Sequence, residues 1–293
     1  MAAYRAWRVA HTLRLPMAED VGGASCRYAA SWLERSMKIK LCSWNVNGFR
    51  AVSAKPDWQW FADSDAQIIG LQETKAQPDQ LTEAQRNPAG WNAWWHSATV
   101  KKGYSGVAVF SKLPHLAVHS DLPDGAWQGE GRLLHVEYEH FHFFNVYFPN
   151  GQNGDARLAY KLGFYAAFLQ HAEALRKHKP IVVCGDFNTA HRPIDLARPK
   201  ENETVSGFLP IERQWMDGFV AAGYVDTFRH VHGDAPDTYS WWSYKTRARE
   251  RNVGWRIDYF FVSEELRPAI RDAWIDTGVH GSDHCPVGLE LEV

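Results

Sequence analysis

Five short polar motifs each follow an apolar run in this 293-residue chain. Each motif places Asn, Glu, Asp or His directly after residues that are typical of a β-strand. In chain order the motifs are Trp44-Asn45-Val46-Asn47-Gly48, Leu71-Gln72-Glu73-Thr74-Lys75, Val146-Tyr147-Phe148-Pro149-Asn150, Cys184-Gly185-Asp186-Phe187-Asn188 and Ser282-Asp283-His284-Cys285-Pro286. Strand ends are rigid and open to solvent, and α/β enzymes place their chemistry there. We therefore expect the motifs to meet at one rim.

The side chains of these motifs suit the hydrolysis of a phosphodiester bond near neutral pH. That reaction needs charge neutralised on the phosphate oxygens, an activated water molecule and help for the leaving oxygen. Oxygen ligands without a cysteine cluster favour Mg²⁺, with Mn²⁺ as an alternative, over zinc. We predict that Glu73 is the main metal carboxylate, and that Asn45 and Asp283 complete the shell directly or through water.

Other side chains of the motifs can act on the water and the phosphate. Asp186 can orient or deprotonate the attacking water, and Asn188 can hold a phosphate oxygen. His284 can donate a hydrogen bond to the charge that develops on the phosphate oxygens. A carboxylate partner would fix the tautomer of His284, and Asp258 in Trp255-Arg256-Ile257-Asp258-Tyr259 is the candidate.

Each motif also has a purely structural explanation. The Asn-Gly pair of residues 47–48 could simply form a turn, and residues 186–188 could form an Asx turn. Glu73 could be a solvated strand end or a residue in the first turn of a helix. The adjacent Asp283 and His284 are more typical of a charged functional turn than of a cap. The motifs taken together exceed coincidence.

Short strands and one long helix must carry these motifs. Apolar residues spaced by three or four predict a helix from about Arg157 to His178. Several strands lack long crossovers, so a mixed sheet fits better than a parallel one, and the pattern indicates an α/β sandwich. The predicted strands are Ile39 to Trp44, Ala66 to Leu71, Gly106 to Ser111, Leu133 to Tyr138, His142 to Phe148, Ile181 to Cys184, Ile257 to Val262 and Val287 to Val293.

Length and composition fit one catalytic domain. Hydrophobic residues make up 45% of the chain and charged residues 23%, so the chain can bury a substantial core. A strand-like run begins at Met37, which suggests a catalytic domain over 37–293 and an N-terminal extension over 1–36. The extension could be an appended tail, the result of an upstream start or, despite its early acidic residues, a transit peptide.

Charge, cysteine and hydropathy patterns narrow the partners and the compartment. A formal net charge of -2 and a pI near 6.7 give no global attraction to polyanions, so a DNA-binding surface needs local clusters of Lys and Arg. The four cysteines form no C-x-x-C pair and are expected to be reduced thiols. No apolar stretch approaches the roughly 18 to 20 residues that span a bilayer, and 1–36 lacks a secretory core, so we expect a cytoplasmic protein without a membrane partner.

The five motifs, in this order, resemble those of the exonuclease III family of apurinic/apyrimidinic (AP) endonucleases, in the endonuclease/exonuclease/phosphatase superfamily. The resemblance runs from Met37 to Val293, and Asn252-Val253-Gly254-Trp255-Arg256-Ile257-Asp258-Tyr259 is a further specific match. It implies a four-layered α/β sandwich of two packed mixed β-sheets flanked by helices. One departure is Asn47, where relatives with a second acid near the metal carry Asp, and this departure weakens a two-metal interpretation.

The resemblance also assigns roles to single residues. It implies that Tyr147 contacts the scissile phosphate or the leaving group, and that Asn150 binds a phosphate. It agrees with the metal, water and phosphate roles given above to Asn45, Glu73, Asp186, Asn188, Asp258 and His284.

The implied partner is double-stranded DNA with an abasic site or a 3′-blocked end. An extruded abasic sugar needs an aromatic or apolar pocket, and by resemblance Trp241, Trp255 and Ile257 fit that role, although Trp241-Trp242 could also be a buried strand pair. Basic loops over 101–105 and 245–251 could grip phosphates, with an ordinary solvated loop as the alternative. The expected DNA-binding residues are Arg50, Lys75, Lys101, Lys102, Tyr104, Asn150, Trp241, Lys245, Arg247, Arg249, Trp255 and Ile257.

The sequence thus predicts a Mg²⁺-dependent phosphodiesterase that incises duplex DNA 5′ to abasic sites, acting as a nucleoid-associated monomer. By resemblance, 3′ to 5′ exonuclease and 3′-phosphatase or phosphodiesterase activities accompany the incision. One alternative is a phosphoesterase of the same superfamily that acts on inositol phosphates, sphingomyelin or RNA tails, against which the Trp255 motif and the basic loops argue. The other is a non-catalytic nucleic-acid-binding regulator, against which the complete set of acidic motif residues argues.

Overall fold

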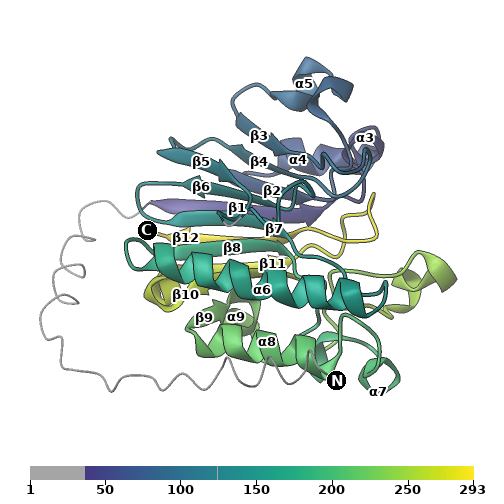
Figure 1. Cartoon of the computed structure of the whole chain (residues 1–293). Coiled ribbons are helices and arrows are strands. Elements are labelled where there is room, and N and C mark those ends of the chain that lie inside the picture. Colours follow the sequence, from purple (N-terminus) through teal and green to yellow (C-terminus); the bar gives the residue numbers. More distant parts are fainter. Residues whose placement is uncertain (1–36, 124) are drawn as a thin grey trace, which may run out of the picture. The chain divides into compact units, whose positions relative to one another are not determined.

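Two mixed β-sheets pack face to face in the computed structural model, which describes residues 37–123 and 125–293 (Figure 1). Each sheet has six strands within these residues. The first sheet consists, in spatial order, of β11 (Ile270–Ile275), β12 (Val287–Glu292), β1 (Lys38–Asn45), β2 (Ile68–Gln72), β4 (Val107–Ser111) and β3 (Asn92–His96). The second consists of β5 (Ala117–Ser120), β6 (Leu133–Glu137), β7 (His142–Tyr147), β8 (Ile181–Asp186), β10 (Asp258–Ser263) and β9 (Tyr224–Asp226).

The two sheets repeat one pattern of strand pairing. In the first sheet β1 is parallel to β2, in the second β7 is parallel to β8, and the other paired strands are antiparallel. Parallel neighbours need a crossover, and the longest helix, α6 (Asp155–Arg176), supplies the one between β7 and β8. The mixed sheets confirm the sequence-based prediction.

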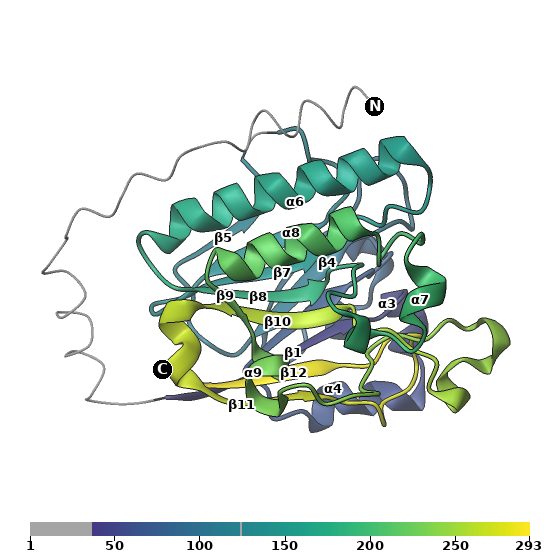
Figure 2. The same cartoon turned by 90° about the horizontal axis from the view of Figure 1, so that it is seen from below.

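Helices cover the outer faces of the two sheets. Figure 2 shows α6 and α8 (Pro210–Ala221) side by side over the second sheet, while α3 (Phe49–Val52) and α4 (Gln59–Asp63) belong to the first sheet's side. The remaining α-helices are α5 (Glu83–Arg86), α7 (Pro199–Asn202) and α9 (Thr227–His232). Short 3₁₀ helices lie at Pro56–Trp58, Pro78–Gln80, Pro193–Asp195, Lys245–Arg247, Arg249–Arg251 and Glu264–Ala269. The predicted four-layered sandwich is confirmed.

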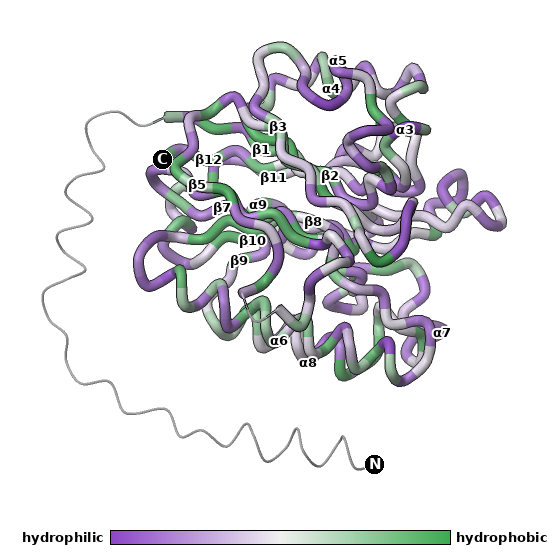
Figure 3. The backbone as a smooth tube through the Cα atoms, turned by 45° about the horizontal axis from the view of Figure 1, so that its top comes forward, coloured by the Kyte–Doolittle hydropathy of each residue, from purple (hydrophilic) through white to green (hydrophobic). Residues whose placement is uncertain are grey.

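The central strands are buried on both faces, so their side chains alternate between two apolar layers. In β4, Val107 and Val109 pack into the layer between the sheets, whereas Ala108 and Phe110 pack toward the helices of the first sheet. Figure 3 shows the hydrophobic colour concentrated on such strands and the hydrophilic colour on the loops. A Cβ on Gly70 would lie 2.9 Å from side-chain atoms of the opposite sheet, so glycine permits the sheets to approach closely here.

All eight predicted strands and the long helix are present, with ends that shift by a few residues. Four strands were not predicted, namely β3, β5, β9 and β11. Three of them, β3, β5 and β11, keep at least half of their residues partly or fully exposed, so their sequences lack the continuous apolar run that marks a central strand.

A cluster of four histidines lies where α6 covers the second sheet. The rings of His119, His135 and Phe144 stack in a row across β5, β6 and β7, with centroids 5.2 and 4.5 Å apart. Nε2 of His135 lies 2.9 Å from Nδ1 of His142, and His171 of α6 packs edge-on 6.3 Å from the His135 ring. We call these four histidines the histidine cluster. It is separate from the polar motifs of the sequence.

Further sequence-based expectations can be compared with the described residues. Cys42, Cys184 and Cys285 are buried free thiols, as expected, whereas Cys26 and the extension 1–36 lie outside the described residues. Among residues 37–123 and 125–293, no helix combines the length and the apolar character that crossing a bilayer requires.

Candidate active site

Strand ends from both sheets lie together at one edge of the sandwich. Because β1 and β2 are parallel, their carboxyl ends are neighbours, and the same holds for β7 and β8. β10 begins at this edge, since its Asp258 pairs in register with Asp186 at the end of β8. β12 runs antiparallel to β1, so the segment before it, with Asp283 and His284, also lies there. Side-chain hydrogen bonds from Asn45 to both Glu73 and Asp186 connect the two sheets at this edge.

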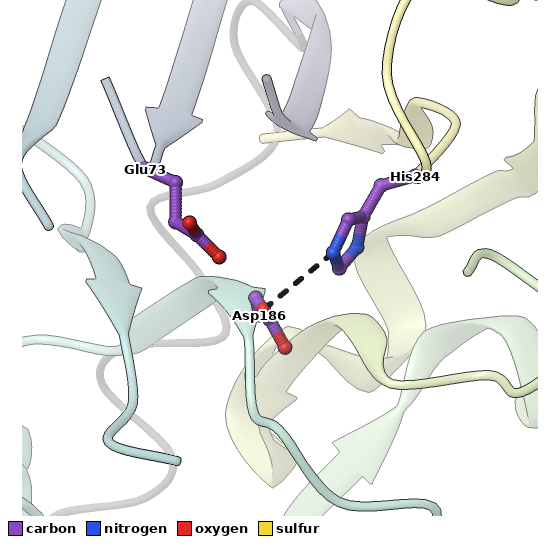
Figure 4. A group of neighbouring side chains, drawn as sticks. All are labelled: Glu73, Asp186 and His284. Atoms are coloured by element: carbon purple, nitrogen blue, oxygen red, sulfur yellow. Dashed lines mark ion pairs between the residues drawn. The ribbon is translucent and has the colours of Figure 1, made fainter. Parts of the chain in front are cut away.

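Glu73, Asp186 and His284 point toward one another from three separate segments (Figure 4). Each of the three offers a ligand atom, and these atoms lie within 4.8 Å of one another. Nε2 of His284 lies 3.9 Å from Oδ2 of Asp186. Carboxylate oxygens are the ligands that hard divalent cations prefer. The carboxylates of this group therefore fit a divalent metal ion held by Glu73, with Asp186 beside it.

Three donors surround the carboxylate of Glu73. Oε1 accepts hydrogen bonds from the Tyr147 hydroxyl at 2.7 Å and from Nδ2 of Asn45 at 3.1 Å, and Oε2 lies 2.8 Å from Nζ of Lys75. Burial opposes ionisation, but Lys75 first, and then Tyr147 and Asn45, outweigh it and hold the pKa of Glu73 below its ordinary value. Burial and Glu73 raise the pKa of Tyr147 well above its ordinary value, so Tyr147 stays protonated and donates a hydrogen bond to Glu73. Glu73 is thus an ionised carboxylate at neutral pH.

Asp186 has the opposite electrostatic environment. Oδ2 accepts a hydrogen bond from Nδ2 of Asn45 at 2.9 Å, and Oδ1 accepts one from the backbone N–H of Asn188 at 2.7 Å. Burial and the neighbouring charge of Asp258 raise the pKa of Asp186 to about 7, although His284 counteracts them. A carboxyl group with such a pKa can exchange a proton near neutral pH, which the more acidic Glu73 cannot do as readily.

His284 is buried between two carboxylates. Nδ1 lies 2.8 Å from Oδ2 of Asp258, and the same oxygen accepts a hydrogen bond from Oγ of Ser240 at 2.6 Å. Burial disfavours the charged ring, but Asp258 outweighs burial and, with Asp186 and Asp283, raises the pKa of His284 to about 10. His284 is therefore a cation whose ring orientation Asp258 fixes.

Asp283 lies outside the group of three potential ligands. Oδ1 accepts a hydrogen bond from Nδ2 of Asn47 at 2.8 Å, and Oδ2 accepts one from Nε1 of Trp241 at 3.1 Å. Asn47 in turn accepts a hydrogen bond from Nζ of Lys75 at 2.5 Å. Asp283 is thus linked to Glu73 through Asn47 and Lys75, and its predicted role at the metal stays a prediction.

Several site residues have backbone conformations that non-glycine residues rarely adopt. The φ angles of Asn47, Glu73, Lys75 and Asn188 are 45°, 49°, 50° and 50°. Such left-handed conformations cost free energy, and they persist where the surrounding hydrogen bonds hold them in place. For Glu73 and Lys75, backbone bonds from Gly48 N–H to the Glu73 carbonyl and from Lys75 N–H to the Ser105 carbonyl serve this purpose.

The two asparagines predicted to bind phosphate are neighbours at the second sheet's edge. Nδ2 of Asn188 donates to the Phe148 carbonyl at 2.9 Å and lies 3.3 Å from Oδ2 of Asp186. Nδ2 of Asn150 donates to Oδ1 of Asn188 at 3.3 Å. Asn150 and Asn188 therefore lie next to Asp186, in reach of any group that it contacts.

An apolar wall borders the polar residues. Trp241, Trp255 and Ile257 belong to one apolar cluster, in which the rings of Trp241 and Trp255 meet edge to face at 6.2 Å. The Trp241 ring lies 6.4 Å from the His284 ring, and both tryptophans are partly exposed. Trp242 instead is buried in a separate cluster, so the buried-pair alternative holds for Trp242 but not for Trp241.

The predicted DNA-binding cations differ in their surroundings. Arg50, Lys101, Lys102, Lys245 and Arg247 are exposed. Arg249 instead donates to the backbone carbonyls of Thr277 at 2.9 Å and Val279 at 2.5 Å, so its guanidinium supports the segment before Asp283. Lys75 pairs with Glu73, as described above. The exposed cations, of which Arg247 forms a surface ion pair with Glu250 at 3.9 Å, can contact a phosphate chain, whereas Arg249 and Lys75 have partners inside the protein.

Sequence reasoning missed two residues beside the site. Ser240 donates to Asp258, and Arg132 donates to the Tyr147 carbonyl at 3.0 Å and lies 4.8 Å from the Tyr147 ring. For Ser240 the available signal was its place directly before Trp241. The sequence around Arg132 carries no comparable signal, because Arg132 lies outside all five motifs and before the motif of Tyr147.

Comparisons with known proteins agree with this geometry. The sequence profile of the Endonuclease/Exonuclease/phosphatase family matches residues 42–284. An exodeoxyribonuclease of Bacillus subtilis (strain 168) is 46% identical over 256 residues, which cover 87% of this chain and 100% of that protein. The DNA repair nuclease APEX1 of Danio rerio is 38% identical over 263 residues, covering 88% of this chain and 84% of that protein.

Solved structures are similar as well. A 3′ phosphatase from Neisseria bound to a product DNA hairpin superimposes with a TM-score of 0.79 and 28% identity, covering 87% of this chain and 100% of that chain. An AP endonuclease from Archaeoglobus fulgidus superimposes with a TM-score of 0.76 and 25% identity over the same shares of the two chains.

Proposed function

Because this chain belongs to the Endonuclease/Exonuclease/phosphatase family, we propose that it is a metal-dependent DNA repair nuclease that incises duplex DNA 5′ to abasic sites. The observation that carries the proposal is the close grouping of an ionised Glu73, an Asp186 with a raised pKa and a cationic His284. This set offers a cation ligand, a proton acceptor and a hydrogen-bond donor within one site. Relatives named as an exodeoxyribonuclease and as AP endonucleases support the choice of substrate.

In the proposed reaction each residue of the site has one task. Asp186 accepts a proton from the attacking water, because its raised pKa suits proton transfer near neutral pH. His284, kept cationic by Asp258, donates a hydrogen bond to a phosphate oxygen that gains charge. A divalent cation held by Glu73, which we propose to be Mg²⁺ with Mn²⁺ as an alternative, would neutralise charge on the phosphate.

Further residues place the substrate in this proposal. Asn188 and Asn150 hold phosphate oxygens, and Tyr147 donates its proton toward the phosphate or the leaving oxygen. Trp241 lies beside His284 and meets Trp255 edge to face, and these two rings would receive the extruded abasic sugar, which exchanges base stacking for contacts with aromatic rings. The exposed cations near residues 101–102 and 245–247 would contact the DNA backbone.

The remaining parts of the proposal concern scope. We assign the catalytic domain to residues 37–293 and keep the monomeric state, the 3′ to 5′ exonuclease and 3′-phosphatase activities and the cytoplasmic, nucleoid-associated location as predictions. The similar structure of the Neisseria 3′ phosphatase bound to product DNA supports the prediction of a 3′-phosphatase activity.

One experiment tests the proposed function. The full chain is incubated with matched abasic, 3′-phosphate and intact duplexes, with Mg²⁺ or with EDTA, and the products are separated by size. We expect incision 5′ to the abasic site that EDTA abolishes, and we expect Glu73→Gln and Asp186→Asn each to lower kcat by roughly 10² to 10⁴. The matched control is Asp272→Asn, which removes an exposed carboxylate of β11 and should leave kcat unchanged. Full activity of Glu73→Gln or Asp186→Asn would contradict the assignment.

A further inference from the structure

A buried arginine connects a predicted DNA-contacting loop to the predicted catalytic tyrosine. The side chain of Arg132 is only 2% exposed, although a guanidinium is costly to bury without partners. Nη1 donates to the Tyr147 carbonyl at 3.0 Å, and Nη2 donates to the Tyr104 hydroxyl at 2.8 Å. The guanidinium also lies over both phenol rings, 4.8 Å from the Tyr147 centroid and 5.6 Å from the Tyr104 centroid. One side chain thus touches both tyrosines.

The charge of Arg132 is balanced locally, so it is not available to a phosphate. Nε donates to Oε2 of Glu130 at 2.5 Å, and Arg157 donates to both oxygens of the same carboxylate at 2.9 Å. Burial opposes ionisation of Glu130, but bonds from Arg157 and the charge of Arg132 outweigh it and lower the pKa of Glu130. Arg157 also donates to the Tyr104 hydroxyl at 2.8 Å. The Tyr104 oxygen therefore accepts from two guanidiniums that share one carboxylate.

The contacts continue on both sides of Arg132. Beyond Tyr147, its hydroxyl donates to Oε1 of Glu73 at 2.7 Å, and the backbone N–H of Tyr147 donates to the Arg132 carbonyl at 2.8 Å. Beyond Tyr104, the next residue, Ser105, accepts a backbone bond from Lys75 at 2.8 Å. A continuous chain of contacts thus runs from the Tyr104 loop through Arg132 and Tyr147 to Glu73.

We propose that Arg132 is a positioning residue that fixes Tyr147 relative to Tyr104, so that the loop contacting DNA and the site of cleavage keep one geometry. The inference rests on the proposed nuclease function and adds a residue to which that function gave no role. A lysine cannot replace Arg132, because a single ammonium lacks the planar fork that reaches both tyrosines and Glu130 at once. Tyr104 then acts on the reaction in two ways, by binding DNA and by accepting a bond from Arg132.

The test uses two substrates of the full chain. One is an abasic duplex, and the other is thymidine 5′-p-nitrophenyl phosphate, a phosphodiester that lacks the flanking DNA strand that Tyr104 is predicted to contact. We expect Arg132→Lys to lower kcat about 10-fold to 100-fold on both substrates, since a lost hydrogen bond from a charged group has about that effect. Tyr104→Phe keeps the ring but removes the acceptor of Arg132, and we expect it to lower kcat on the small diester several-fold. The double variant should be no slower than Arg132→Lys alone, because both changes break one chain of contacts.

The control is Arg176→Lys on α6, which alters a partly buried arginine that lies 5.4 Å from the Tyr224 ring and pairs with Glu265, away from Tyr104 and Tyr147. It should leave kcat and KM unchanged on both substrates. The proposal is overturned if Tyr104→Phe changes only KM for the duplex, or if the effects of Tyr104→Phe and Arg132→Lys multiply. Should Arg132→Lys fail to fold, Tyr104→Phe still decides, because Tyr104 is partly exposed. If the wild-type chain cleaves the small diester but no DNA, the proposed function is refuted. The role of Arg132 can still be tested with the small diester.

Discussion

Two buried histidines of this protein are held in opposite charge states. His284 and His135 are exposed to a similar extent, 4% and 3%, and each has a ring nitrogen within 3 Å of a partner. The partner of His284 is the Asp258 carboxylate, which outweighs burial and raises the pKa of His284 to about 10. The partner of His135 is a second histidine, and burial together with His142, His119, His171 and Lys179 lowers its pKa to about 3.

The difference shows that burial favours the neutral ring at both places and that a carboxylate partner overcomes burial at His284. At the active-site edge, strand ends supply carboxylates that keep His284 charged, and a charged imidazole can stabilise a phosphate oxygen. Under α6, rings from three strands and one helix supply packing surface, and the neutral form is the one that packs there. Charge is therefore kept where the proposed chemistry needs it and is avoided where the core needs apolar contacts.

The strongest test of this comparison removes the carboxylate beside His284. We expect Asp258→Asn to lower kcat on an abasic duplex by roughly 10² to 10⁴, because His284 loses the group that keeps it charged and oriented. Steady-state kinetics with saturating DNA and metal measures the effect. His135→Gln, at the other buried histidine, is the matched control and should keep kcat near the wild-type value. An unchanged kcat in Asp258→Asn would break the comparison.

The histidine cluster should make the fold sensitive to acid. The pKa values of His135 and His142 are lowered to about 3 and about 4 in the folded chain, chiefly by burial, against an ordinary value of 6.5. Below pH 6.5 the unfolded chain therefore binds protons that the folded chain does not bind. The free energy of unfolding is highest above pH 6.5 and decreases as the pH falls toward 4.

We expect these two rings to reduce the free energy of unfolding by up to about 2.7 kcal/mol per pH unit between roughly pH 6 and 4. The groups facing them are His119, His171, His178, Lys179 and Glu137, of which Glu137 acts in the opposite direction on His142. Urea unfolding at pH 7, 6 and 5 measures the slope. His135→Gln keeps a hydrogen-bonding group but cannot take the proton, so its slope should be shallower by about one proton. An equal slope in wild type and variant would remove His135 from the explanation.

The smallest expected effect concerns the residue that holds Asp258. Oδ1 of Asp258 has no hydrogen-bond partner among the described residues, so the donors to Oδ2, Ser240 and His284, fix the carboxylate. We expect Ser240→Ala to lower kcat about 10-fold, the usual effect of a lost hydrogen bond to a charged group, while Ser240→Thr restores most of it. The ratio of the two kcat values checks this, and equal values for both variants would show that the hydroxyl does not act through Asp258.

The sequence predicted the central strands, whose ends carry the site, better than the strands at the sides of the sheets. Central strands such as β8 are continuous apolar runs that end in polar motifs, and both features are visible in one dimension. Edge strands such as β3, with the partly exposed Trp94 and Trp95, mix polar and aromatic residues and pair on one side only, with β4. Such a mixed segment lacks the local pattern that identifies a strand, and its strand conformation depends on packing in the sheet.

The site shows the same limit at the level of single residues. Glu73, Asp186 and His284 were identified because each occurs in a motif of its own. The pKa directions of Glu73 and Asp186 could not be predicted, because they depend on burial in the folded chain, on Lys75 beside Glu73 and on Asp258 in the strand next to Asp186. The histidine cluster was invisible for the same reason, since its members meet only when β5, β6, β7 and α6 pack together.

The position of β1 affects how this protein can fold during its synthesis on the ribosome. β1 lies between β2 and β12, and β12 comes from residues 287–292. A nascent chain that lacks these residues leaves one side of β1 without hydrogen-bond partners and lacks the hold that β12 gives to the segment with Asp283 and His284. We therefore expect the site to be completed only when β12 has been synthesised and has paired with β1.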